Sequence, residues 1–219
     1  MTARLHESDP AQIIREGSLI LGVPLDPDAV TKLVRHLEFL NEWRGRAKLT
    51  SLNTMPQMAV LHVLDSLTVF KVLPLGGHLR VIDVGTGGGF PGIVMRITDN
   101  SMNLTLMDAD AKKIVFLKHL IRHLALDGLC FLNARLERFV VESEFSPFDL
   151  VVARAFSSEP ALLQPLSHLV SKNGLLIRML GPSPVDNRFW LADFREEAVW
   201  EGTLPFSTRT RRVIRYVRS

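Results

Sequence analysis

The stretch "VIDVGTGGGFPG", Val81–Gly92, contains five glycines within eight residues, directly after an apolar run. Glycine inside regular structure costs about 0.5–1 kcal/mol relative to alanine. Five glycines would cost at most about 2.5–5 kcal/mol, a large part of a total stability of about 5–15 kcal/mol. Such a loop indicates that something approaches the backbone so closely that side chains are excluded.

Beyond residue 78 the chain alternates between segments of strand type and helix type. Strand-like apolar runs occupy residues 79–84, 103–108, 129–135, 148–154 and 174–180, and helical patterns occupy 91–98, 110–126 and 158–170. Repeated βα units predict a parallel sheet covered by helices on both faces. Residues 198–206 and 211–217 predict two closing strands. We therefore expect a Rossmann-like α/β fold: a mostly parallel seven-stranded sheet with an antiparallel C-terminal hairpin.

The first seventy-odd residues have helical character instead. Three helices are predicted at residues 9–22, 26–46 and 55–73. The second begins with Asp26 as N-cap and Pro27 at the first helical position, which are favourable residues there. We expect residues 1–74 to form a helical N-terminal extension packed on a core of residues 75–219.

Charge and cysteine content narrow the class of protein. The net charge is +3 in 219 residues, yet Arg209–Arg218 holds five arginines and no acid. This run favours a polyanionic partner, although a solvated edge strand explains it equally well. Cys130 is the single cysteine, which excludes an intrachain disulfide and a cysteine metal cluster, and we expect it to be buried in its strand. No signal core or run of 18 apolar residues occurs, so a cytoplasmic protein without a membrane span is expected.

Three kinds of ligand site are considered for the glycine loop; the alternative without a ligand is that Asp83 caps the turn and Asp108 is a helix N-cap. A P-loop is excluded, because no lysine occurs between Val81 and Lys112. A dinucleotide fingerprint fits Gly87, Gly89 and Gly92, with Asp108 placed to hold a ribose. S-adenosylmethionine is favoured by Asp83, because an acid suits its ammonium and sulfonium groups but would repel a pyrophosphate. On this interpretation Asp83, Gly85, Gly87 and Asp108 contact the cofactor.

A methyl donor requires a nucleophile held in line with the methyl group. A buried Cys130 would not attack a pyrimidine, and "VVARAFSS" (151–158) replaces the Asn/Asp-Pro-Pro-aromatic motif of amine methyltransferases. The remaining targets are already nucleophilic, such as a ring nitrogen. No metal and no covalent enzyme intermediate are expected.

Several motifs together resemble the bacterial small-subunit ribosomal RNA methyltransferase G family, also called glucose-inhibited division protein B. They are "LTSL" (49–52), "HVLDS" (62–66), "IDVGTGGGFPGI" (82–93), "TLMDADAKKIVFLK" (105–118), "NARLERF" (133–139) and "FDLVVARAF" (148–156). The resemblance implies a class I S-adenosylmethionine-dependent methyltransferase that methylates N7 of a guanine in 16S ribosomal RNA of the small subunit. Methylation of another RNA, a protein or a small molecule, or a degenerate cofactor-binding relative, stays open.

The resemblance also implies site residues. Cofactor contacts fall on Gly85, Phe90, Asp108, Leu136, Glu137 and Arg154, and substrate positioning falls on Arg135 and Arg154. Arg209, Arg211 and Arg215 share one strand face by alternation and are expected to contact RNA. The family's Leu-Lys-Gly is Met179-Leu180-Gly181 here, and we expect Arg178, on the same strand face as Leu180, to replace the lysine. The protein is expected to be a monomer.

Overall fold

The computed structural model describes residues 9–73, 76–154, 160–181 and 193–219. Its centre is one seven-stranded sheet with the strand order β3-β2-β1-β4-β5-β7-β6. The strands are β1 Arg80–Val84, β2 Asn103–Asp108, β3 Leu129–Asn133, β4 Phe148–Arg154, β5 Val170–Leu180, β6 Phe194–Thr203 and β7 Thr210–Arg218. Strands β1 to β5 are parallel, and β7 is antiparallel to both β5 and β6. The predicted parallel sheet with an antiparallel closing hairpin is confirmed.

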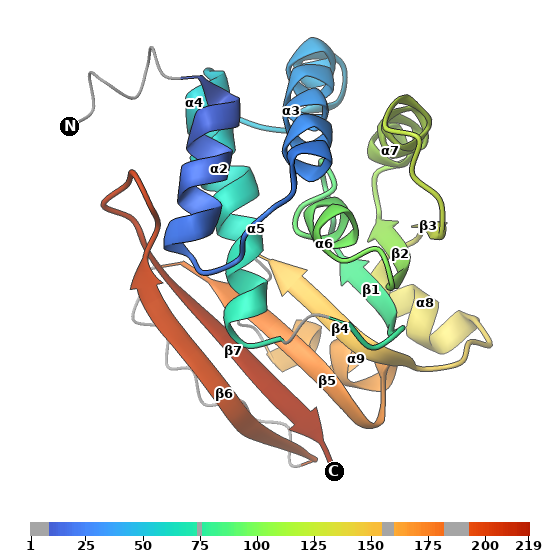
Figure 1. Cartoon of the computed structure of the whole chain (residues 1–219). Coiled ribbons are helices and arrows are strands. Elements are labelled where there is room, and N and C mark those ends of the chain that lie inside the picture. The colour runs from blue at the N-terminus through green and yellow to red at the C-terminus, as the bar shows by residue number, and fades with distance from the viewer. Residues whose placement is uncertain (1–8, 74–75, 155–159, 182–192) are drawn as a thin grey trace.

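Helices cover both faces of this sheet (Figure 1). One face carries α2 Pro10–Ile20, α3 Pro27–Ala47, α4 Met55–Met58, α5 Asp65–Leu67, α6 Gly92–Thr98 and α7 Ala111–His123. The other face carries α8 Leu136–Glu142 and α9 Pro160–Leu169. Apolar residues of the N-terminal helices, such as Leu33 and Leu64, share a core with Val81 of the sheet. The boundary that we expect between residues 74 and 75 lies outside the described residues.

The third N-terminal segment departs from the single α-helix expected over 55–73. After α4 the chain forms a π-helical stretch, Ala59–Leu64, then α5, then a 3₁₀ turn, Thr68–Lys71. Short π-helical turns inside helices are frequent at functional sites. Here the π-helical stretch ends beside Asp65 and contains His62, and both side chains line a cavity described below.

Two further differences concern β3 and the chain after it. Helix α8 was not predicted: it has seven residues, of which Leu136 alone is buried, so its apolar pattern is weak. Cys130 is exposed, so its predicted burial is wrong. The reason is that β3 lies at the edge of the sheet, where one side of the strand has no neighbour. No helix among the described residues has the length and apolar character needed to cross a membrane.

Candidate active site

The glycine-rich loop joins the end of β1 to α6 and adopts a backbone that requires glycine. Gly85 has φ +73° and Gly87 has φ +57°, both in the left-handed region. A Cβ atom added to Gly85 would meet nothing within 4 Å, so the space beside this residue is open. The Gly87 N–H donates to Asp108 Oδ2 over 3.0 Å, which ties the loop to the end of β2.

Asp83 supports this loop from beneath. It is fully buried, and its Oδ2 accepts a hydrogen bond from the Gly92 N–H over 2.8 Å. Burial raises the pKa of Asp83 to about 6, although the nearby Thr86 hydroxyl and the hydrogen bond from Gly92 oppose this rise. Asp83 does not line the cavity beside the loop, which is described below. The structure therefore places it against the loop backbone and not at the expected cofactor contact. The physical reason is that Gly92 uses the carboxylate to begin α6.

A first cavity, of about 350 Å³, opens at the carboxyl ends of β1 and β2. Its lining includes Gly85, Asp108, Lys113, Arg135, Leu136 and Glu137. Asp108 is mostly buried, and its two oxygens accept from the Asp110 N–H at 2.9 Å and the Gly87 N–H at 3.0 Å. Lys113 lies 3.5 Å from the same carboxylate. The structure thus brings together Gly85, Asp108, Leu136 and Glu137, which were expected to contact the cofactor. It also places beside them Arg135, which was expected to position the substrate.

Phe90 connects the loop to the N-terminal helices. Its ring stacks on His36 of α3, with centroids 4.4 Å apart, and on His62, with centroids 4.6 Å apart. His36 Nε2–H donates to the Gly88 carbonyl over 2.7 Å. Arg154 lies 5.5 Å from the Phe90 ring centroid. Phe90 is therefore a buried spacer between the loop and these helices, and it does not line the first cavity.

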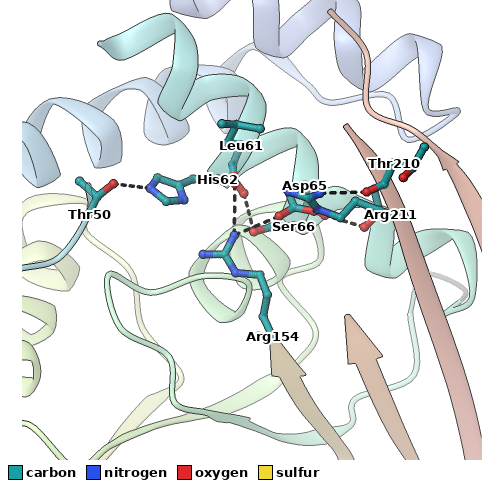
Figure 2. A network of polar contacts seen from close by, with 9 residues as sticks. Thr50, Leu61, His62, Asp65, Ser66, Arg154, Thr210 and Arg211 are labelled. Atoms are coloured by element: carbon teal, nitrogen blue, oxygen red, sulfur yellow. Dashed lines mark hydrogen bonds and ion pairs between the residues drawn. The ribbon is translucent and has the colours of Figure 1, made fainter. Parts of the chain in front are cut away.

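Burial keeps the two stacked histidines neutral near pH 7. Burial lowers the pKa of His36 to about 4, against the opposing effect of the Gly88 carbonyl. Burial, and to a smaller extent the Arg154 charge, lower the pKa of His62 to about 3. Thr50 Oγ1 and His62 Nε2 are hydrogen-bonded at 2.8 Å, which fixes the orientation of the His62 ring (Figure 2).

A second cavity, of about 320 Å³, lies beside the first, at the ends of β4 and β5. Its polar lining consists of His62, Asp65, Arg154, Arg209 and Arg211. Figure 2 shows Asp65 between two arginines: Oδ1 accepts from Arg211 Nε at 2.8 Å, and Oδ2 lies 3.4 Å from an Arg154 nitrogen. Arg154 also donates to the Leu61 carbonyl. Ala153 pairs with Val84, the last residue of β1, so Arg154, the last residue of β4, lies on the strand next to the one that leads into Gly85.

Two arginines and one carboxylate leave this second cavity with an excess of positive charge, to which Arg209 adds. Burial lowers the pKa of Arg154, and the charges of Asp65 and Asp83 raise it. Such a cavity can accept an electron-rich or anionic group while the carboxylate limits the repulsion between the arginines.

Comparison with known proteins identifies the family. The rRNA small subunit methyltransferase G (GidB) family matches residues 29–195, about three quarters of the chain. The chain belongs to this family. A ribosomal RNA small subunit methyltransferase G of Acinetobacter baumannii is 33% identical over 175 residues, which cover 80% of this chain and 82% of that protein. One from Syntrophus aciditrophicus is 35% identical over 184 residues, covering 82% of this chain and 76% of that protein.

Solved structures agree on the fold of this family member. TrmN from Thermus thermophilus superposes with a TM-score of 0.59 at 14% identity, covering 82% of this chain and 53% of that chain. A coclaurine N-methyltransferase bound to N-methylheliamine and SAH gives a TM-score of 0.53 at 14% identity, covering 76% and 57%. This chain thus spans little more than half of either structure. The likeness establishes the Rossmann-like class I methyltransferase fold.

The family member's hairpin arginines lie differently from what the strand pattern suggests. Arg209 and Arg211 line the second cavity, but Arg211 is paired with Asp65. Arg215 binds the Val72 carbonyl and lies 3.0 Å from Glu197 Oε2, so it does not line that cavity. Arg211 and Arg215 do share one face of β7, as predicted. Both contact the N-terminal segment, Arg211 at Asp65 and Arg215 at the Val72 carbonyl.

Arg178 and Arg135 also differ from the expected arrangement. Arg178 is only 3% exposed and is not part of the second cavity, although Leu180 on the same face is. Burial lowers the pKa of Arg178, and a hydrogen bond with Tyr216 raises it. The expected replacement of the family lysine by Arg178 therefore lacks the necessary placement. Arg135 lines the first cavity and Arg154 the second, so the two arginines do not face one pocket.

Sequence reasoning missed His36. It lies three residues after Leu33 and one before Leu37, on the buried face of α3, and is fully buried. A histidine within an apolar helical face was the available signal. Among the described residues, no group of three or more histidine, cysteine or acidic side chains is arranged to hold a metal ion.

Proposed function

We propose that this chain transfers a methyl group from S-adenosylmethionine to N7 of a guanine in 16S ribosomal RNA of the small subunit. The observation that carries the proposal is the pair of adjacent cavities at the carboxyl ends of β1, β2 and β4. Ligands in open α/β sheets bind at this edge. Membership of the family supplies the reaction class.

The first cavity fits S-adenosylmethionine. The open space beside Gly85 accepts a group that approaches the backbone, and about 350 Å³ lies within the usual range of small-molecule pockets. A carboxylate has about four lone-pair sites, so Asp108 retains capacity for ribose hydroxyls beside its two backbone partners. Leu136 and Glu137, at the start of α8, offer backbone and side-chain contacts. The cofactor, when bound, supplies an electrophilic methyl group.

The second cavity suits the purine. Arg154 and Arg209 carry donors for the guanine O6 atom or its phosphate, which are acceptors. N7 must keep its lone pair to act as nucleophile, so we assign the arginine donors to O6 and phosphate and none to N7. A neutral His62 and the Asp65 carboxylate fit a base that gains positive charge as its N7 is methylated.

Binding of the cofactor is tested by calorimetry with S-adenosylmethionine. Asp108→Ala is expected to weaken binding by about 1–3 kcal/mol, because a charged acceptor is lost. Asp110→Asn is the matched control: it lies two residues away, outside the first cavity, and asparagine can still cap α7. Tight NADH binding without S-adenosylmethionine binding would favour the dinucleotide alternative.

The substrate is tested by mass mapping of N7-methylguanine in 16S RNA, using small subunits from cells with and without this protein. Methylation at one guanine that depends on the protein is expected. Leu180, which lines the second cavity, favours one other candidate, a degenerate relative that binds the cofactor without turnover. Cofactor binding with no transfer to RNA, protein or small molecules would identify that case. That the protein acts as a monomer, in the cytoplasm and without a metal remains a prediction. The division of the chain near residue 74 also remains a prediction.

A further inference from the structure

A third cavity, of about 250 Å³, lies between the end of α3 and the start of α7. It is lined by Trp43, Arg46, Ala47, Ala111, Lys112 and Val115, and we call it the α3–α7 shelf. The two helices lie side by side and are joined by ring contacts such as that between Phe39 and Phe116, at 5.7 Å (Figure 1). None of these residues lines the first or the second cavity.

The shelf combines an apolar floor with cations at its rim. Val115 is 47% exposed, one of the few large apolar side chains on the surface of the described chain. The Arg46 guanidinium lies 5.3 Å from the Trp43 ring centroid. Arg46 and Lys112 are both exposed, and within the described ranges neither has a carboxylate within 4.0 Å. The lining contains no acid, so the rim attracts an anionic ligand and repels a cationic one.

The position of the shelf links it to the first cavity. Lys112 lines the shelf, whereas its neighbour Lys113 lines the cavity that holds Asp108. The first turn of α7 therefore separates the two. The N-terminus of α7 is already capped by Asp110, whose Oδ1 accepts from the Lys112 N–H, so the rim charges and not the helix end attract the ligand.

We propose that the α3–α7 shelf binds an unpaired nucleotide of the substrate RNA, close in sequence to the target guanine, and this rests on the proposed function. The base packs on Trp43 and Val115, and the flanking phosphates contact Arg46 and Lys112. Proteins that bind single-stranded RNA combine cations with an aromatic or apolar surface on which bases stack. The shelf holds the strand while the guanine occupies the second cavity, so it contributes to substrate affinity and not to the transfer step.

The variants are chosen to leave the fold intact. Arg46→Ala with Lys112→Ala removes the two rim charges, and Val115→Glu places an acid on the exposed floor without opening the core. Trp43 is left unchanged, because it packs against Phe116 and His119. Arg15→Ala is the matched control: Arg15 is an exposed arginine that lines none of the three cavities, and its helix α2 lies on the other side of α3 from α7 (Figure 1).

Two measurements test the proposal. Methyl transfer to unmethylated small subunits should show KM raised at least tenfold in both shelf variants, with kcat and the S-adenosylmethionine Kd unchanged. With a fluorescein-labelled single-stranded oligoribonucleotide, the double variant should lower the slope of log affinity against log salt by about 0.7 for each lost phosphate contact. Arg15→Ala should leave KM unchanged and alter the slope little. KM values equal to wild type in both shelf variants would overturn the inference, whereas a wild-type protein that methylates no guanine would overturn the proposed function instead.

The identity of the occupant is tested by photo-crosslinking. A protein with p-benzoylphenylalanine in place of Val115 is irradiated on small subunits. A crosslink to a nucleotide near the methylated guanine is expected. A crosslink to a ribosomal protein, or to RNA remote from that guanine, would overturn the assignment.

Discussion

The closing hairpin, residues 194–218, holds six arginines, whereas the α3–α7 shelf is rimmed by Arg46 and Lys112 alone. Yet most of the hairpin arginines are paired with acids or carbonyl groups of this same chain. Arg212 lies 2.9 Å from Glu201, its direct partner across the strands, and Arg215 lies 3.0 Å from Glu197 at an irregularity in the β6 register. Arg218 donates to two carbonyls near the end of α9. Strand register, which places acids opposite arginines, therefore decides which hairpin charges remain available to RNA.

Removal of Asp65 should have the largest effect. Its side chain is 7% exposed and contacts Arg154 and Arg211, whose side chains are 21% and 13% exposed. Asp65→Ala leaves two poorly solvated cations without their acid, so we expect a loss of about 3 kcal/mol in the free energy of unfolding. Urea denaturation measures it.

The control for Asp65 lies on the same hairpin. Glu201, whose side chain is 64% exposed, contacts Arg212, and Glu201→Ala should cost less than about 1 kcal/mol because water screens this pair. Equal losses for the two variants would mean that burial does not distinguish the inner from the outer face of the hairpin.

Lowering the pH should destabilise the region around α3 more than the hairpin. Helix α3 carries His36 as well as the shelf residues Trp43 and Arg46, whereas the hairpin contains no histidine. The pKa of His36 is lowered from 6.5 to about 4, so its contribution to stability is present above pH 6.5 and is lost as the pH falls toward 4. We expect a loss of about 3 kcal/mol from His36 over this range. His62, with a pKa of about 3, acts in the same direction.

Asp83 opposes this trend. Its pKa is raised from 3.8 to about 6, so its contribution is present below pH 3.8 and is lost as the pH rises through 6. The net profile of the wild type is therefore shallower than the histidines alone would give. His36→Gln keeps an N–H donor for Gly88 but cannot gain a proton. Urea titrations at pH 7 and pH 4.5 should show a smaller loss on acidification in this variant; an unchanged loss would exclude His36 as its source.

Arg209 and Arg211 differ in their availability to RNA, although both belong to the hairpin. Arg211 is held by Asp65, whereas Arg209 is exposed and has no ion pair among the described residues. Arg209→Ala should lower the slope of log RNA affinity against log salt by about 0.7, and Arg211→Ala should lower protein stability with little change in slope. The reverse pattern in fluorescence anisotropy would mean that Arg211 leaves Asp65 when RNA binds.

The sequence predicts the sheet well because the apolar runs and the glycine loop are local signals. The Asp108 side chain, the Gly85 loop and the start of α8 come together because they follow the ends of three parallel strands, a relation that alternation alone implies. The partners of the arginines were not predictable in this way. Asp65 and Arg211 are 146 residues apart, and their contact depends on how the N-terminal helices pack on β7. The sequence leaves open whether Asp83 caps the turn or contacts a ligand, and no local pattern decides for the bond that it accepts from Gly92.

The two edges of the sheet give the last and smallest test. Strand β6 closes one edge, and β3, which carries Cys130, closes the other. A buried thiol replaced by serine would leave a polar group in the core, but Cys130 is exposed, so its hydroxyl substitute remains solvated. Cys130→Ser should therefore change the free energy of unfolding by less than about 0.5 kcal/mol and leave methyl transfer intact. Alkylation of the native protein checks the premise: iodoacetamide should modify Cys130 without prior unfolding. A thiol that reacts only in urea, or a stability loss above about 1 kcal/mol, would show that this edge is covered. The two edge strands would then be kept from pairing with other chains in different ways, β6 by its charged side chains and β3 by packing that covers it.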